Sequence, residues 1–148
     1  MEIPTGVFDN NVIAAAFISR FAKSASILAV NAIRELRVRL AYSEETLHEL
    51  AVVLQLDHFR REHNKSEAEI RAFCDTLRVV GVKYEPRKQV PVSLARDITD
   101  TKFLDLALAA DADFLVTNDA RHLLRLKQIG QTKILTPHKF LLALNREP

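Results

Sequence analysis

Residues 114–119 read Phe-Leu-Val-Thr-Asn-Asp, an apolar run that ends at an acid. A short, continuous apolar run of this kind is typical of a strand in the middle of a sheet. Asp119 then precedes a helix that we expect from Ala120 to Gln128. Asp119 is therefore a candidate N-cap of that helix and also a side chain at the carboxyl end of a strand. The two interpretations are compatible, because a cap in this place also faces any pocket beyond the sheet.

Strands and helices alternate outward from this segment. Strands are predicted at residues 3–8, 37–42, 82–84, 114–117 and 133–135, and helices from about residues 11, 25, 44, 66, 99, 120 and 137. Residues 57–65 are expected to form a polar, basic connection. The alternation predicts the α/β class with a mainly parallel sheet of four or five strands. Ligands of such sheets bind beyond the carboxyl ends of the strands.

The composition is that of a globular chain. Its 148 residues fit one domain, residues 1–148, and 3 Gly and 5 Pro predict no long linker. The sequence has no apolar run of about 18 residues and no signal-peptide pattern, so we expect no membrane span. Cys74 is the single cysteine, and we expect it to be a buried core thiol in a cytoplasmic protein.

Four acids are spread over the chain, each at the end of a predicted element or on a predicted helix: Asp9, Glu49, Asp100 and Asp119. Asp9 and Asp119 each follow a predicted strand, which places both at the same edge of the sheet. Asp9 has turn formation or helix capping as its alternative role, and Glu49 has a solvated helix face.

Asp100 heads a helix face that is otherwise apolar, whereas Asp105 is expected to point outward. A helix cap and a place in a cleft are equally good interpretations of Asp100. Asp97 adds a second acid three residues earlier.

Acids that converge raise one another's pKa unless a cation neutralises them. Oxygen ligands favour Mg²⁺ or Mn²⁺ over zinc, so we expect one of these two ions if the four acids meet. The five histidines have no zinc-type spacing, and the three glycines form no phosphate-binding loop.

With these acids in view, the chain resembles PIN-domain proteins, specifically the toxins of type II toxin–antitoxin systems. The resemblance covers nearly the whole chain in five segments: Val7-Phe8-Asp9-Asn10-Asn11-Val12, Ser43-Glu44-Glu45-Thr46-Leu47-His48-Glu49-Leu50, Arg96-Asp97-Ile98-Thr99-Asp100 with Phe103-Leu104-Asp105-Leu106-Ala107, Ala112-Asp113-Phe114-Leu115-Val116-Thr117-Asn118-Asp119, and Ile134-Leu135-Thr136-Pro137. It implies a three-layer α/β/α fold in which the four acids lie at one end of the sheet.

The resemblance also implies an activity, that of a metal-dependent ribonuclease acting on single-stranded or looped RNA. Asp9, Asp100 and Asp119 would bind the metal, and Glu49 would be a further ligand or would position water. The supporting residues would be Asn11, Asp97, Thr117 and Asn118. A cognate antitoxin protein is implied by the same resemblance.

Asn10 departs from the family pattern, which usually has Thr between the Asp and the Asn. We expect the Asn10 amide to replace the Thr hydroxyl as a hydrogen-bond donor to Asp9. The departure also supports an alternative function, a catalytically silent module that binds RNA or a protein partner.

Two further expectations concern binding surfaces. The candidate contacts to RNA phosphates are Arg20, Lys23, Arg60, Arg61 and Arg121. Apolar residues beyond one stripe on the predicted helices at 25–35 and 66–79, for example Val30 and Ile33 beside Ile27 and Leu28, predict a homodimer. The alternative is that both helices only fill the core of one chain.

Overall fold

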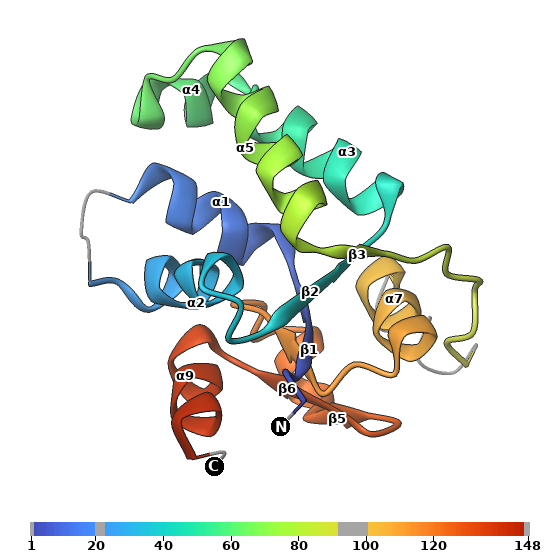
Figure 1. Ribbon diagram of the computed structural model, residues 1–148. Coiled ribbons are helices and arrows are strands. Elements are labelled where there is room, and N and C mark those ends of the chain that lie inside the picture. The colour runs from blue at the N-terminus through green and yellow to red at the C-terminus, as the bar shows by residue number, and fades with distance from the viewer. Residues whose placement is uncertain (1, 20–22, 92–100, 147–148) are drawn as a thin grey trace.

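A six-stranded sheet forms the centre of the protein (Figure 1). The computed structural model describes residues 2–19, 23–91 and 101–146, and all strand assignments below refer to them. The strand order is β3-β2-β1-β4-β6-β5, with bounds β1 (Thr5–Phe8), β2 (Arg39–Tyr42), β3 (Val82–Lys83), β4 (Phe114–Val116), β5 (Gln128–Ile129) and β6 (Thr132–Leu135). Neighbouring strands pair in parallel except β5 and β6, which are antiparallel. The predicted mainly parallel sheet is confirmed, with one strand more than expected.

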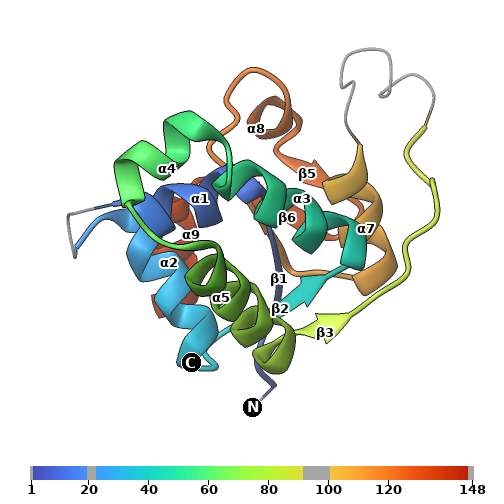
Figure 2. The same ribbon diagram turned by 90° about the horizontal axis from the view of Figure 1, so that it is seen from above.

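Helices lie on both faces of this sheet, as the view from above shows (Figure 2). The helices of the described residues are α1 (Asn10–Ile18), α2 (Ala25–Arg34), α3 (Glu44–Leu54), α4 (Asp57–His63), α5 (Glu67–Val80), α7 (Lys102–Ala110), α8 (Leu123–Leu126) and α9 (Pro137–Arg146). One apolar cluster joins the sheet to α1, α2, α3, α5 and α9, and a second joins its other face to α7 and α8. The three-layer α/β/α fold is thereby confirmed.

The strands divide their side chains between the two clusters because successive residues of a strand point to opposite faces. Phe8 and Val116 pack in the first cluster, whereas Val7 and Leu115 pack in the second. All four side chains are buried. This explains why residues 114–116 read as an unbroken apolar run: both faces of the sheet are covered.

Phe140 of α9 fixes the position of the central strands. Its buried ring meets Phe8 of β1 edge-on, with 5.5 Å between centroids, and Phe114 of β4 at 5.4 Å. Edge-to-face pairs of this kind stabilise a core beyond the area that they bury. The C-terminal helix therefore holds β1 and β4 in place from one side.

Helix α4 was not expected, because residues 57–65 looked like a polar connection. The segment holds one large apolar side chain, Phe59, which packs against the first cluster. Asp57 lies in the first turn and Arg60, Arg61 and His63 in the last, an arrangement that complements the helix dipole. Local charge placement thus stabilises a short helix that has too few apolar residues to show helical periodicity.

The helix expected from Ala120 to Gln128 is also wrong in part. Helix α8 spans only Leu123–Leu126, and Gln128–Ile129 forms β5. Lys127 has φ 64° and Gly130 has φ 54°, values that end the helix and turn the chain into the β5–β6 hairpin. The helix predicted from Thr99 or Asp100 is seen from Lys102 onward, and those two residues lie outside the described part.

Cys74 lies on the buried side of α5 and is 3% exposed, as expected. Burial raises the pKa of its thiol, although the nearby Arg78 charge opposes the shift. In the described residues no helix is both long and apolar enough to cross a membrane.

Gly81 joins α5 to β3 in a place with no room for a side chain. A Cβ there would lie 2.9 Å from the Leu77 carbonyl oxygen, 2.9 Å from Tyr42 Cδ1 and 3.0 Å from the Leu40 carbonyl oxygen. We expect Gly81→Ala to lower the free energy of unfolding by about 1–3 kcal/mol, because two backbone groups must move. Urea denaturation measures this change.

Gly130→Asn is the matched control. Gly130 has a positive φ that Asn tolerates, and its nearest neighbour would be Leu108 Cδ2 at 3.4 Å. The control should change stability by less than about 1 kcal/mol. An unchanged urea midpoint for Gly81→Ala would contradict the steric argument.

Candidate functional site

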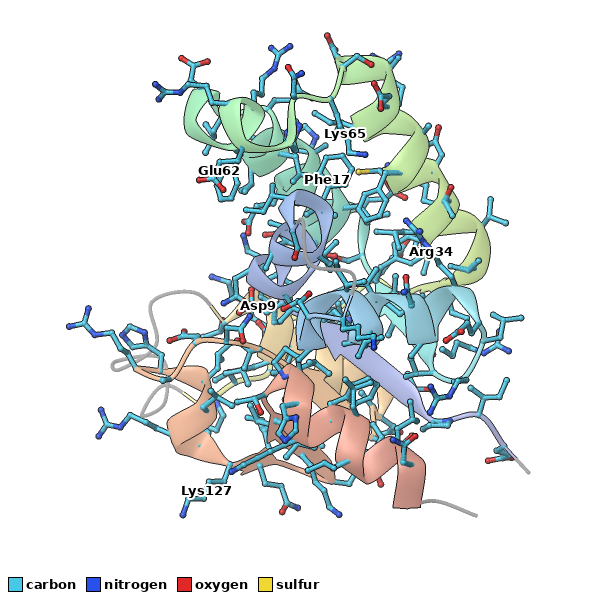
Figure 3. The ribbon with its side chains drawn as sticks, turned by 90° about the vertical axis from the view of Figure 1, so that its left-hand side faces the viewer. Asp9, Phe17, Arg34, Glu62, Lys65 and Lys127 are labelled. Atoms are coloured by element: carbon cyan, nitrogen blue, oxygen red, sulfur yellow. The ribbon has the colours of Figure 1, made fainter. Side chains whose placement is uncertain are left out.

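Strands β1 and β4 end side by side and at the same level. Phe8 pairs with Val116, and the Asp9 N–H donates to the Val116 carbonyl oxygen at 2.9 Å. The residues that follow the two strands, Asp9 and Thr117, are therefore neighbours at the carboxyl edge of the sheet. Figure 3 shows Asp9 where β1 ends and α1 begins.

Thr117 connects two of the predicted acids. Its buried hydroxyl donates to Asp9 Oδ2 at 2.8 Å and accepts the Asp119 N–H at 3.0 Å. Asp9 Oδ1 also accepts the Asn11 N–H at 3.4 Å, so Asp9 caps α1. Asp9 therefore both caps α1 and lies at the carboxyl edge of the sheet.

Asp119 is held by the turn that follows it. Its Oδ1 accepts the backbone N–H groups of Arg121 and His122, both at 3.1 Å, and lies 3.5 Å from His122 Nδ1. The preceding residue, Asn118, donates its N–H to Asn11 Oδ1 at 3.3 Å. The polar residues after β1 and after β4 thus form one hydrogen-bonded group.

Asn10 reaches a third acid, Glu49 of α3. Its side-chain amide donates to Glu49 Oε1 and to the Thr46 carbonyl oxygen, each at 3.2 Å. The expectation that this amide would bind Asp9 is therefore wrong, and the Thr117 hydroxyl binds Asp9 instead. Because Asn10 is buried and both of its N–H groups have partners, it fixes the position of Glu49 relative to β1.

Lys102 is a component of the site that the sequence reading missed. It is the first residue of α7, its side chain is 20% exposed, and its ammonium contacts Glu49 Oε2. Glu45 Oε1 lies 4.0 Å from the same ammonium. The sequence holds no local signal for this contact, because Lys102 and Glu49 are 53 positions apart.

Asp105 was expected to point outward, but it is 5% exposed. Its carboxylate accepts the N–H groups of Gln89 at 2.8 Å and Val90 at 3.1 Å, and the Thr101 hydroxyl at 3.2 Å. A buried carboxylate is tolerated when backbone donors satisfy it in this way. Asp105 therefore ties the segment after β3 to α7, a structural contact that a helical wheel does not reveal.

Several predicted site residues lie outside the described part of the chain: Asp97, Asp100 and Arg20. Of the described residues, Asp9 and Asp119 are joined by hydrogen bonds through Thr117, and Asn11 links the segments that follow β1 and β4. Glu49 of α3 binds the side chain of Asn10, the residue after Asp9, in a separate contact. Within residues 2–19, 23–91 and 101–146, no three His, Cys, Asp or Glu side chains are grouped closely enough to hold a metal ion. The predicted ligand Asp100 lies outside these residues, so the metal site stays a prediction.

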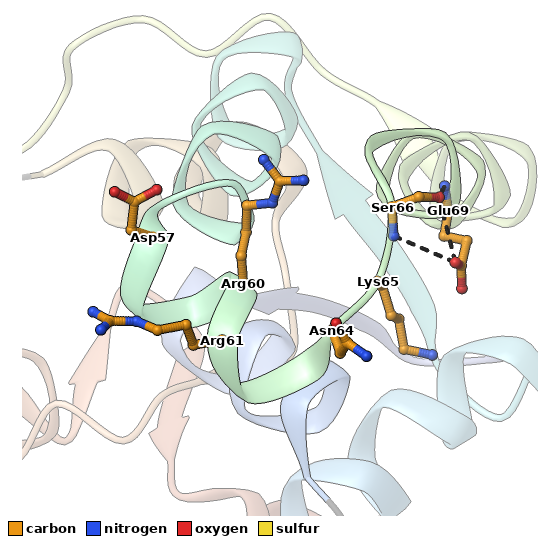
Figure 4. A pocket seen from close by; sticks show the side chains of 7 residues that line it. All are labelled: Asp57, Arg60, Arg61, Asn64, Lys65, Ser66 and Glu69. Carbon is orange, nitrogen blue, oxygen red and sulfur yellow. Dashed lines mark hydrogen bonds between the residues drawn. The ribbon is translucent and has the colours of Figure 1, made fainter.

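The predicted basic contacts fall in different places. Arg121 is exposed beside Asp119, and Lys23 is exposed before α2. Arg60 and Arg61 of α4 line an open hollow with Lys65, and Figure 4 shows their two guanidinium groups pointing away from each other. Asp57 and Glu69 also line this hollow, so its charge is mixed.

Comparison with known proteins adds to this geometry. The family model described as the PIN domain matches residues 5–121. Among solved structures, the crystal structure of PAE2754 from Pyrobaculum aerophilum matches with a TM-score of 0.54 and 15% identity, over 98% of this chain and 91% of that one. At this identity the match shows a similar fold alone. No curated protein matches the chain.

The Thr117 hydroxyl can be tested without reference to activity. Thr117→Val keeps the shape of the side chain but removes a donor to Asp9 and an acceptor for the Asp119 N–H. We expect the free energy of unfolding to fall by about 1–3 kcal/mol, because a buried polar group loses its partner. Urea denaturation of Thr117→Val and of the hydroxyl-retaining control Thr117→Ser measures this effect. Equal losses in the two variants would contradict a role for the hydroxyl.

Proposed function

Because the chain belongs to the PIN-domain family, whose members are generally nucleases, we propose that it is a metal-dependent endoribonuclease that cleaves single-stranded or looped RNA. The observation that carries the proposal is the pair of acids at the ends of β1 and β4, joined through the Thr117 hydroxyl. These acids lie where parallel sheets bind their ligands.

The residues present fit a hard divalent cation, Mg²⁺ or Mn²⁺. Asp9 and Asp119 offer carboxylate oxygens from a partly exposed edge, and the backbone and Thr117 hydrogen bonds hold both carboxylates in fixed positions. In our proposal Asp100 completes the ligand set. When bound, such an ion supplies Lewis acidity for a phosphodiester and activates water.

The chain's own residues orient the reactants in this proposal. Thr117 and Asn11 set the spacing of the first and last acids through their hydrogen bonds. Arg121 is exposed next to Asp119 and is placed to contact an RNA phosphate; Lys23, Arg60 and Arg61 would extend the basic surface. Unstacked RNA is the proposed substrate because its backbone can enter a cleft that a duplex cannot.

Cleavage of a 5′-labelled, unstructured RNA in Mg²⁺ or Mn²⁺ tests this function. We expect Asp9→Asn and Asp119→Asn each to lower the rate by at least about 100-fold, because each replaces a charged metal ligand with a neutral amide and so weakens binding of the ion that the proposed reaction needs. Asp113→Asn is the matched control: Asp113 stands at the other end of β4, where its carboxylate accepts the Thr5 N–H. It should cleave as the parent does.

Other outcomes of this experiment decide between the functions. RNA binding without cleavage by the parent, under all metal conditions, would favour the catalytically silent module. Equal loss in Asp113→Asn would show that charge or stability, and not the proposed site, controls the rate.

We further propose that the protein acts in the cytoplasm as the toxin of a toxin–antitoxin pair, a role supported by the sequence resemblance described above. Expression of the parent alone should arrest bacterial growth, and Asp9→Asn should relieve the arrest.

A cognate antitoxin would need a docking surface. A groove between α1, α2 and α5 is a candidate, and Phe17 and Phe73 are among its lining residues. The Lys65 ammonium lies over the Phe17 ring, and the Arg34 guanidinium lies over the Phe73 ring; Figure 3 labels Phe17, Lys65 and Arg34.

The homodimer also stays a proposal. Two of the residues expected to contact a partner, Val30 and Ile33, are buried in the chain's own core, whereas Leu28 of α2 and Val79 of α5 are exposed. Light scattering at micromolar concentration should give twice the chain mass of 16.8 kDa. Leu28→Asp and Val79→Asp should lower this mass. Dimer formation would bury the new carboxylate in an apolar contact, and the loss of its hydration would weaken the dimer. A parent mass of one chain would refute the dimer.

A further inference from the structure

The ion pair between Lys102 and Glu49 is a feature that the proposed chemistry does not use. Glu49 was expected to bind metal or to position water, yet both of its oxygens have partners in the folded chain. Oε1 accepts from the Asn10 amide at 3.2 Å, and Oε2 contacts the Lys102 ammonium. The Asn10 amide is itself fixed by the Thr46 carbonyl oxygen. Glu49 is therefore held by its neighbours in a definite orientation.

The position of Lys102 on its helix points to a role beyond ordinary stability. Lys102 is the first residue of α7, where the positive end of the helix dipole disfavours a cation. Nearby acids offset that cost, since Glu49 contacts the ammonium and Glu45 lies 4.0 Å from it. A fixed positive charge is thus placed beside the acidic edge of the sheet at a helix position that does not favour it.

We propose that Lys102 is a tethered counter-ion that keeps Glu49 out of the metal ligand set and so weakens divalent-ion binding. This inference rests on the proposed metal-dependent function. The ammonium and a divalent ion compete for the same carboxylate oxygen, and the ammonium also repels an ion bound to the neighbouring acids. Lys102 is a positioning residue in this scheme: it acts through Glu49 and on the charge of the site.

Calorimetric titration with Mn²⁺ tests the proposal directly. We expect Lys102→Met to bind Mn²⁺ about three- to tenfold more tightly than the parent, because one repelling charge is lost and Glu49 is released. Lys102→Arg keeps the charge and should bind Mn²⁺ as the parent does. Lys139→Met, at an exposed position on α9, is the control for loss of one positive charge elsewhere.

A double-mutant comparison identifies Glu49 as the released group. Glu49→Gln in the parent should weaken Mn²⁺ binding, because the charge of Lys102 is then no longer cancelled; in Lys102→Met the same change should remove the gain and return the affinity to that of the parent. Thermal melts add a readout independent of activity. In EDTA, Lys102→Met should melt below the parent, and Mn²⁺ should raise its melting temperature by more than it raises that of the parent.

Failure of the proposed function and failure of this inference alone would give different results. A parent that binds no Mn²⁺ by calorimetry or thermal melts would overturn the metal dependence of the proposed function, and this inference with it. A parent that binds Mn²⁺ while Lys102→Met binds it equally or more weakly would overturn this inference alone. Should Lys102→Met fail to fold, Lys102→Gln carries the same expectations, since it also removes the charge but keeps a hydrogen-bond donor.

Discussion

The parallel register between β1 and β4 is the constraint on which the rest of the structure depends. Phe8 pairs with Val116, and the Asp9 N–H binds the Val116 carbonyl oxygen. A slip of one residue would turn every side chain of one strand to the opposite face. Phe8 would then leave Phe140, and Thr117 would no longer lie beside Asp9. The aromatic packing in the core therefore sets the geometry of the site at the edge.

The site gathers acids from several elements and holds each with a different donor. Asp9 accepts from a buried hydroxyl, Asp119 from backbone N–H groups, and Glu49 from an amide and an ammonium. Each donor satisfies hydrogen-bonding capacity of the carboxylate that it contacts. Neutral donors hold a carboxylate without cancelling its charge, whereas the ammonium at Glu49 cancels it. The three described acids are thus held by chemically different donors, although the sequence shows them as similar side chains.

The parts that were predictable from sequence are those that local pattern controls. The apolar run at residues 114–116 and the polar residues that follow it placed β4 and Asp119 correctly, because burial on both faces and a strand end leave local signatures. Ser43 and Ser66 mark helix starts for the same reason, each forming a capping box. The partners of Asn10, Lys102 and Asp105 could not be read in this way. The contacts of Asn10 with Glu49, of Lys102 with Glu49 and of Asp105 with Val90 join residues 39, 53 and 15 positions apart, and only the tertiary fold decides them.

Those long-range contacts connect this edge of the sheet to both apolar clusters. Helix α3 packs in the apolar cluster on one face of the sheet, and α7 packs in the cluster on the other. The pair between Glu49 and Lys102 spans the two layers, and Asn10 joins Glu49 to the end of β1. A carboxylate that only bound metal could be lost at no cost to the fold, as like charges would then be fewer. Glu49 differs, because its loss takes one partner from a partly buried ammonium and one from a buried amide. The folded state therefore depends directly on this side chain.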